Sequence, residues 1–268
     1  MIKALFFDVD GTLLDHSPEG GSRMPDSTRR SLRLVGEKGI LSFVASGRIP
    51  SWVTFLGDLY PFDGYLSVNG QYAIDRSGQV LYQSPHCPED ILQLVELVRQ
   101  DPFPCLIIEE NECFSVAPSP LIDEHFAWAS LPPPPVYDPA RLRDHPVLQF
   151  CLYMTKEEGA RRLAPLRHVE ITSAGGEILD VIPKGGGKEV GIAAVAQRFG
   201  WKREEIMVFG DGDNDCRMLS WAGTGVALGN GTPAAKAAAD YVTAPIGEDG
   251  IQKALLHFGL LTPEDLAT

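Results

Sequence analysis

The chain has 268 residues, of which 44% are hydrophobic and 22% are charged, a composition typical of a folded protein with one large domain or two modest ones. Its formal net charge of −13 disfavours nucleic acid as a main partner, because polyanions are repelled. The first apolar run is too short for a signal peptide, and no run approaches the length of a membrane span. We therefore expect a soluble, cytoplasmic protein without a membrane partner.

The cysteines are odd in number and scattered, with no CxxC pair and no zinc-like spacing with histidine: Cys87, Cys105, Cys113, Cys151 and Cys216. This pattern favours free thiols in a reducing compartment over a disulfide framework. The histidines are also dispersed and lie mostly in polar stretches, which favours surface positions over metal-binding or catalytic ones.

The first predicted element is a strand over residues 2–9, an apolar run that ends on acids. A helix is predicted over residues 27–38, with polar residues suited to a cap at its start and a glycine just past its end. A second apolar run, 39–45, ends at a Ser-Gly-Arg cluster, and a third ends at a Val-Asn-Gly turn, 68–70. Apolar runs that stop at polar clusters are typical of buried parallel strands.

The middle of the chain, residues 84–177, has a different pattern of helical and strand-like segments, and we predict an inserted α+β domain there. It holds helical patterns at 88–99 and from about 156, strand-like runs at 105–108 and 148–154, and a rigid proline segment at 132–135. The flanking segments, 1–83 and 178–268, form the predicted catalytic core.

The last part of the chain returns to the earlier pattern. A predicted helix over 188–199 is stopped by Gly200, and an apolar run over 206–209 leads into Gly-Asp-Gly-Asp-Asn-Asp. Strands that alternate with helices predict a doubly wound, Rossmann-like parallel α/β sheet. Ligands of such sheets bind beyond the carboxyl ends of the strands, where all four polar clusters fall.

The first cluster places Asp8 and Asp10 at the end of a strand, just before Gly11. Strand alternation alone would send the two carboxylates to opposite faces. At a strand end the backbone is free to turn, so one acid can face a phosphorus atom while the other reaches its leaving group. A turn with two solvated acids is the alternative interpretation.

Two further clusters contain groups that could bind an anion. The residues Ser46–Arg48 offer a hydroxyl and a backbone amide at a strand end, although a Ser-Gly turn without a ligand is common. In Pro-Lys-Gly-Gly-Gly-Lys-Glu, 183–189, glycines let Lys184 or Lys188 approach an anion at a helix start, unless the loop is flexible and its lysines are solvated. A nucleotide-binding P-loop is excluded, because Glu189 stands where Ser or Thr should follow the lysine.

The fourth cluster packs Asp211, Asp213 and Asp215 into one short turn after a buried strand. Carboxylates that repel each other in so small a space need a cation, and oxygen ligands of this kind suit Mg²⁺. A helix–loop–helix calcium site is disfavoured, because Met218 and Leu219 occupy the region where its later ligands would lie. An acidic turn without a metal is the other interpretation.

In this order, Asp-x-Asp-Gly-Thr, Ser-Gly-Arg, a glycine-flanked lysine and Gly-Asp-Gly-x-Asn-Asp resemble the motifs of the haloacid dehalogenase (HAD) superfamily of phosphatases. The resemblance covers residues 2–73 and 176–255. The insertion point between them is similar to that of the Cof-like subgroup, type IIB, which carries an α+β cap there. The resemblance implies a Mg²⁺-dependent phosphatase that hydrolyses phosphate monoesters of small metabolites through an aspartyl-phosphate intermediate.

Carried over by position, the resemblance makes Asp8 the nucleophile. Asp10 would protonate the leaving oxygen in the first step and activate water against the aspartyl-phosphate in the second. Covalent catalysis of this kind divides one hard displacement into two easier steps. Ser46 would bind the transferring phosphoryl group, and Gly47 would offer its backbone amide.

The resemblance also implies a set of Mg²⁺ ligands. These are the Asp8 carboxylate, the backbone carbonyl of Asp10 and the Asp211 carboxylate. Asp215 would bind the metal or orient a water molecule, and Asn214 would lie near the phosphate. The metal would clamp the phosphoryl oxygens and neutralise their charge.

Lys188 would offset the charge on the nucleophile and the phosphate. It is preferred to Lys184 because the family pattern is Pro-Lys-Gly-x-x-Lys-Gly, although Glu189 replaces the last glycine here. Asn69, in an Asn-Gly turn of the kind found in this subgroup, and Arg48 are expected to contact substrate.

The resemblance leaves the substrate open. Sugar phosphates are the leading class, followed by phosphorylated cofactors such as pyridoxal phosphate or flavin mononucleotide. Specificity would lie in the cap, where possible contributors are Phe114, His125, Trp128 and Tyr153, although aromatic cap residues more often form the core of the cap itself. The competing functions are a phosphomutase acting on sugar phosphates and a non-catalytic binding protein. The oligomeric state stays open.

Overall fold

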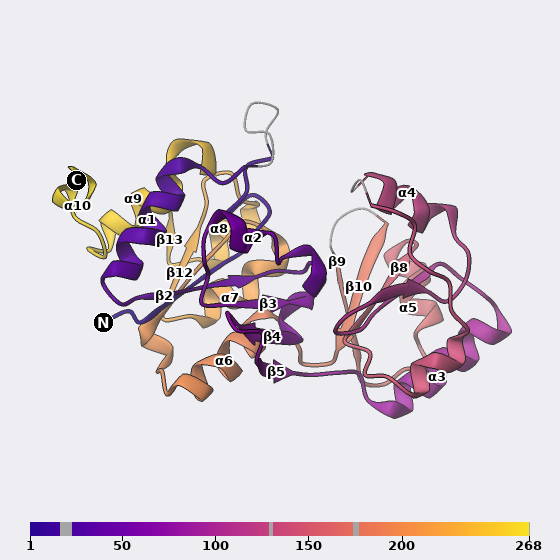
Figure 1. The fold of residues 1–268 in the computed structure, drawn as a ribbon. Helices are drawn as coiled ribbons and strands as arrows, with labels where there is room; N and C mark the ends of the chain where they lie inside the picture. The colour runs from indigo at the N-terminus through magenta and orange to yellow at the C-terminus, as the bar shows by residue number, and fades with distance from the viewer. Residues whose placement is uncertain (17–22, 129–130, 174–176, 268) are drawn as a thin grey trace. The chain divides into compact units, whose positions relative to one another are not determined.

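The computed structural model describes residues 1–16, 23–128, 131–173 and 177–267 (Figure 1). The chain folds into two compact units. The first comprises Met1–Ser46, Val53–Tyr82 and Gly187–Thr268, and the second comprises Gly47–Trp52 and Gln83–Gly186. Within the described ranges, no helix is long and apolar enough to cross a membrane.

The first unit is built on an eight-stranded sheet, counted over the described residues, with the order β13-β12-β11-β1-β2-β3-β4-β5. Its strands are β1 (Ala4–Phe7), β2 (Leu41–Ala45), β3 (Gly64–Ser67), β4 (Tyr72–Asp75), β5 (Val80–Gln83), β11 (Ile206–Gly210), β12 (Thr224–Ala227) and β13 (Tyr241–Val242). The pairs from β13 to β3 are parallel, and β4 pairs antiparallel with β3. The predicted doubly wound α/β sheet is therefore confirmed.

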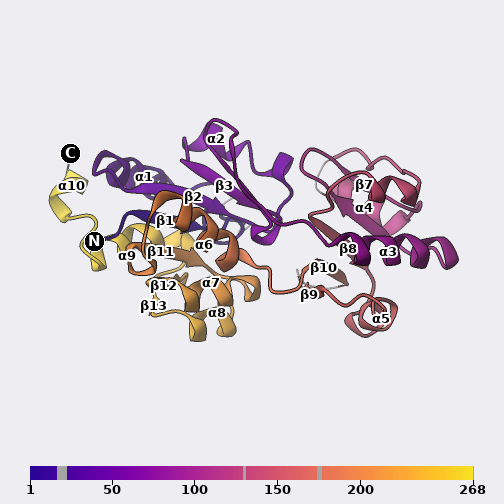
Figure 2. The same cartoon turned by 90° about the horizontal axis from the view of Figure 1, so that it is seen from below.

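Helices cover both faces of this sheet (Figures 1 and 2). They are α1 (Asp26–Glu37), α2 (Leu56–Leu59), α6 (Lys188–Phe199), α7 (Cys216–Trp221), α8 (Pro233–Ala238), α9 (Gly250–His257) and α10 (Pro263–Ala267). The alternation of β1 decides which helix packs where: Leu5 and Phe7 join a core with α1 and α9, whereas Ala4 and Phe6 join a core with α6, α7 and α8. Helix α6 has the predicted bounds and ends where Gly200 adopts a left-handed φ of 70°.

The second unit is an α+β sandwich. Its antiparallel sheet has the order β7-β6-β8-β10-β9, formed by β6 (Cys105–Ile108), β7 (Cys113–Ser115), β8 (Gln149–Tyr153), β9 (Val169–Ser173) and β10 (Ile178–Pro183). The helices are α3 (Pro88–Gln100), α4 (Pro120–Trp128) and α5 (Lys156–Arg162). A separate core forms where Leu94 and Val95 of α3 pack with Phe150 and Leu152 of β8.

The boundary predicted after residue 177 is wrong. Residues 178–183 form β10, which pairs antiparallel with β8 and β9, so this segment belongs to the second unit. Its apolar pattern resembles that of a core strand, and only its hydrogen-bonding partners assign it to a sheet. The second unit therefore extends to Gly186.

Short 3₁₀ helices complete the described structure at Pro50–Trp52, Pro139–Arg143, Arg203–Glu205, Asp213–Asp215 and Ile246–Glu248, and Val68–Gly70 forms a turn with positive φ values. The five cysteines are all free, as the sequence predicted.

Candidate active site

The predicted polar residues follow the strands at one edge of the first unit's sheet. Asp8 follows β1, Ser46 follows β2, and Asp211 follows β11. Because β11, β1 and β2 are parallel neighbours in register, their carboxyl ends meet at the same edge. The topology therefore gathers residues that are about 200 positions apart in the chain, as expected for a doubly wound sheet.

Lys188 lies at the centre of this group. It is the first residue of α6, and its side chain is only 1% exposed. Its Nζ lies 2.5 Å from Oδ1 of Asp8 and 2.7 Å from Oδ1 of Asp215. Of the two candidate lysines, the structure brings this one to the acids, whereas Lys184 is exposed within the second unit.

The Asp211 loop is organised by Asp215, which is fully buried. One carboxylate oxygen of Asp215 accepts from Lys188, and the other accepts from the backbone amides of Asp211 and Gly212, both at 2.9 Å. The side chain thus holds its own loop and the lysine in one arrangement. Asn214 is exposed in the same turn.

Three carboxylates converge beside this one lysine. Ligand oxygens of Asp8, Asp211 and Asp215 all lie within 4.8 Å of one another. The pKa of Asp8 is raised to about 8, first by burial and then by the charge of Asp215, and the charge of Lys188 opposes this shift. Burial also raises the pKa of Asp211 to about 6, although the hydrogen bond from Thr12 opposes this shift. The cluster therefore has more negative charge than the lysine compensates, and a divalent cation would relieve the excess.

The pKa of Lys188 is also raised, but by the neighbouring charges and not by burial. Burial alone would lower it, but the charges of Asp215 and Asp8 outweigh burial and hold the pKa above its ordinary value. Lys188 is therefore a permanent cation at neutral pH.

Gly11 allows the first loop to approach the Asp211 loop closely. Its φ is 85°, and a Cβ at this position would lie 2.2 Å from Oδ2 of Asp211, so no other residue fits without movement. Next to it, Thr12 donates through Oγ1 to Oδ1 of Asp211 at 2.8 Å. Asn230 donates to the Gly11 carbonyl at 2.8 Å, which ties a third loop to the same place.

A strained turn supports the other side of the group. Val68, Asn69 and Gly70 have consecutive φ values of 55°, 51° and 85°, and such values are costly for a β-branched residue such as Val68. The amide of Asn69 donates to the Ser46 carbonyl at 3.0 Å, and both residues are buried. The turn thus fixes the ends of β2 and β3 relative to each other.

The family model of the haloacid dehalogenase-like hydrolases matches residues 5–255. The chain belongs to this family. The family predicted from the four motifs is therefore confirmed, and the loops described above are the loops that carry those motifs.

Three similar proteins support the assignment. The YkrA protein of Bacillus subtilis (strain 168) is named as a proposed phosphatase. It is 32% identical to this chain over 260 residues, which cover 97% of this chain and 98% of YkrA. A phosphatase of the HAD superfamily from Bacteroides thetaiotaomicron is 31% identical, with a TM-score of 0.88 over 97% of this chain and 96% of that chain. A sugar phosphatase of HAD subclass IIB is 35% identical, with a TM-score of 0.84 over 97% of this chain and 100% of that chain.

In this HAD-type hydrolase, the side chain of Asp10 is exposed, unlike the buried carboxylates of Asp8 and Asp215. The exposed fraction is 47%, and Oδ1 of Asp10 lies 2.6 Å from Nε2 of His16. The sequence assigned the histidines to the surface, which holds for His16, 40% exposed, and is wrong for His86, which is buried. His16 nevertheless contacts a motif residue, a partnership that the spacing of the two residues does not indicate.

The other expected residues fall in different places. Gly47 and Arg48 belong to the second unit, whereas Ser46 belongs to the first. Phe114 is buried in the second unit's core, and Trp128 is 84% exposed. His125 and Tyr153 contact each other, with the imidazole Nδ1 2.7 Å from the phenol oxygen.

The sequence analysis assigned Thr12 no role beyond its place in the first motif and assigned no role to Asn230. Thr12 donates to Asp211, and Asn230 donates to the Gly11 carbonyl, in each case from another loop. For Thr12 a signal existed, since it lies within Asp-x-Asp-Gly-Thr. Asn230 lies 219 positions from Gly11, and only the fold brings the two together.

Proposed function

We propose that this hydrolase is a Mg²⁺-dependent phosphatase that removes phosphate from small metabolites through an aspartyl-phosphate on Asp8. The observation that carries the proposal is the convergence of Asp8, Asp211 and Asp215 within 4.8 Å beside the buried Lys188. A carboxylate nucleophile, an anion-binding lysine and an acidic metal site are the parts that phosphoryl transfer through an aspartyl-phosphate uses.

The donor set fits Mg²⁺, because every candidate ligand is an oxygen atom. The Asp8 and Asp211 carboxylates, with the backbone carbonyl of Asp10, would hold the ion, and Asp215 would keep the Asp211 loop in place. The bound ion would neutralise charge on the transferring phosphoryl oxygens. Thr12 and Asn230 donate to Oδ1 and Oδ2 of Asp211, at 2.8 and 3.4 Å, in the manner of outer-sphere groups at metal sites.

In the first step, a carboxylate oxygen of Asp8 bonds to phosphorus while the bond from phosphorus to the leaving oxygen breaks. Asp10 gives its proton to that oxygen, and the exposure of its side chain suits exchange of the proton with solvent. In the second step, Asp10 takes a proton from water, which attacks phosphorus and releases phosphate from Asp8. Lys188 and Ser46 would bind the phosphoryl oxygens during both steps.

We infer that sugar phosphates are the main substrates. The support is the 35% identical sugar phosphatase of subclass IIB, which aligns over 97% of this chain. The second unit, as the predicted cap, would choose among leaving groups.

Phosphate release from a panel of phosphorylated metabolites, with and without Mg²⁺, tests the proposal. We expect release that requires Mg²⁺ and falls at least about a thousandfold in Asp8→Asn, because the nucleophile is lost. Asp213→Asn is the matched control. Asp213 lies in the same loop but is exposed and accepts from Thr232 at 2.7 Å, so its variant should retain activity. Full release in Asp8→Asn would contradict the mechanism, and isomerised sugar phosphate without free phosphate would indicate a mutase.

A further inference from the structure

We propose that Cys87, Asp90 and His168 form a second metal site, which lies wholly in the second unit and takes a thiophilic transition ion of the Zn²⁺ class. One ligand atom from each residue lies within 4.8 Å of the other two. The three donors are sulfur, oxygen and nitrogen, a set that differs from the all-oxygen set beside Lys188.

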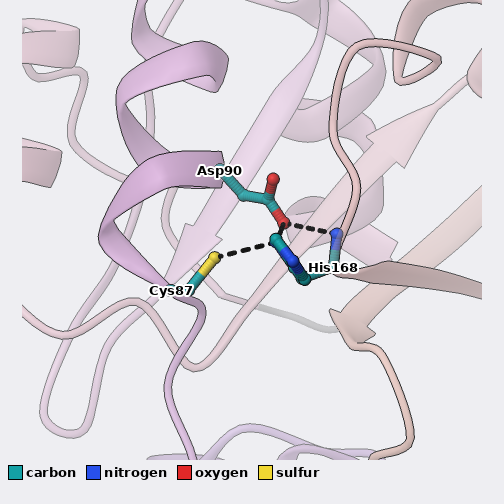
Figure 3. A group of neighbouring side chains, drawn as sticks. All are labelled: Cys87, Asp90 and His168. Carbon is teal, nitrogen blue, oxygen red and sulfur yellow. Dashed lines mark hydrogen bonds and ion pairs between the residues drawn. The ribbon is translucent and has the colours of Figure 1, made fainter.

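Two segments of the second unit supply the ligands (Figure 3). Cys87 immediately precedes α3, and Asp90 lies in the first turn of that helix. His168 immediately precedes β9. The sequence shows no zinc-like spacing here because Cys87 and His168 are 81 residues apart. The fold therefore creates a cluster that the sequence does not reveal.

The distances fit a coordination polyhedron. Sγ of Cys87 and Oδ2 of Asp90 each lie 3.5 Å from the same atom, Nδ1 of His168. Zinc–ligand bonds of about 2.3 Å to sulfur and about 2.0 Å to nitrogen or oxygen place tetrahedral ligands roughly 3.3–3.5 Å apart. A catalytic triad would instead use the two different ring nitrogens of the histidine, one for each partner.

The Asp90 carboxylate is already oriented for this role. Asp90 is 2% exposed, and its two oxygens accept from the backbone amides of Arg167 and His168, at 3.0 and 2.8 Å. The amide of His168 thus fixes the carboxylate beside the imidazole of the same residue. Carboxylates that bind metals are typically held by such outer hydrogen bonds.

The charge and exposure of the cluster suit a divalent ion. A deprotonated Cys87 and Asp90 would carry two negative charges, which one dication balances. The His168 side chain is 55% exposed, so an ion can reach the site and a water molecule can complete a fourth position. Thiolate and imidazole ligands favour zinc over magnesium, which makes the two sites selective for different ions. A bound ion would tie the start of α3 to the start of β9.

Cobalt titration of the metal-stripped, full-length protein, with excess Mg²⁺ to occupy the first site, tests the proposal. We expect one Co²⁺ per chain, with a thiolate-to-cobalt charge-transfer band that Zn²⁺ abolishes by displacement. Cys87→Ser should remove the band. Cys113→Ser is the matched control, because Cys113 is a partly buried cysteine of the same unit outside the cluster, and its variant should keep the band.

His168→Gln provides an independent variant at an exposed position, and we expect it to weaken Co²⁺ binding at least about tenfold. Circular dichroism of each variant checks that the fold is retained. Absence of the band in the unmodified protein would overturn the proposal. So would a band that survives in Cys87→Ser and disappears in Cys216→Ser, because Cys216 lies next to Asp215 of the first site.

Discussion

Lys188 carries a positive charge that water hardly screens, because only 1% of its side chain is exposed. Its two ion-pair partners, Asp8 and Asp215, are themselves buried. A cation in such a place has a structural as well as a chemical role, since without it the carboxylates would repel each other in a medium of low dielectric constant.

We predict that Lys188→Met lowers the free energy of unfolding by about 3–5 kcal/mol in the absence of Mg²⁺, because it leaves buried carboxylates without their partner. Lys184→Met makes the same chemical change at an exposed position and should have little effect. Urea denaturation of both variants measures the difference. Equal stabilities would mean that the lysine does not compensate the acid cluster.

The same comparison separates the two lysines in catalysis. Phosphate release should fall strongly in Lys188→Met and stay close to that of the unmodified protein in Lys184→Met. A loss of activity in Lys184→Met alone would reverse the assignment that the family pattern suggested.

His125 gives a pH-dependent prediction for the second unit. Burial lowers the pKa of its imidazole below the ordinary 6.5, and the charge of Asp180 opposes that shift. The neutral form is thus favoured in the folded state. The resulting stabilisation is present in full above pH 6.5 and is lost as the pH falls through the folded-state pKa. An NMR titration should place the midpoint below 6.5, and Asp180→Asn should lower it further. A midpoint above 6.5 would contradict the burial argument.

At the scale of elements, helix α6 is positioned by the turn after β3. A Cβ on Gly70 would lie 2.5 Å from the carbonyl oxygen of Gly187 and 2.8 Å from Cα of Lys188. The turn at residues 68–70 therefore packs directly against the start of the helix that presents the lysine. Backbone strain in this turn is offset by the close packing that it allows.

We predict that Gly70→Ala reduces both stability and activity, because the new methyl group must push the start of α6 away. Gly78→Ala is the matched control, because the φ of Gly78 is 86° against 85° for Gly70, yet nothing lies within 4 Å of its missing Cβ. Both variants incur about 1–2 kcal/mol of backbone strain. Gly70→Ala should lose about 1–3 kcal/mol more by overpacking, and only this variant should lose phosphatase activity. Chemical denaturation and phosphate release test the two parts separately.

At the scale of the whole molecule, the two units have separate hydrophobic cores. Phe150 is fully buried in the core of the second unit, and Phe6 is fully buried in the first, where it stacks on Phe43 at 4.9 Å. Because each core lies within one unit, we expect a core substitution to destabilise mainly the unit that contains it.

We predict that Phe150→Ala destabilises the second unit by about 3–5 kcal/mol, the usual range for a deleted core phenylalanine. Hydrogen exchange should then accelerate mainly in residues 83–186. Phe6→Ala should have the reciprocal effect and accelerate exchange in the segments of the first unit. Uniform acceleration throughout the chain in both variants would show that the molecule opens as a single cooperative unit.

Several elements could be predicted because their signals are local. Helix α6 and strand β6 have the predicted bounds, since the spacing of apolar residues and the glycine that ends the helix are properties of neighbouring positions. The chemistry of the polar clusters was equally local, and so Asp8, Asp211 and the pair Lys184 and Lys188 could be singled out as candidates before any fold was known.

The partners of these residues were decided by the tertiary structure. The apolar run at 178–183 could have joined either sheet, and backbone pairing with β8 and β9 placed it in the second unit. Likewise, the choice of Lys188 for the acids, the contact of Asn230 with Gly11 and the meeting of Cys87 with His168 join residues far apart in the chain. Periodicity and side-chain chemistry describe a residue and its neighbours, whereas such contacts depend on how strands align and helices pack.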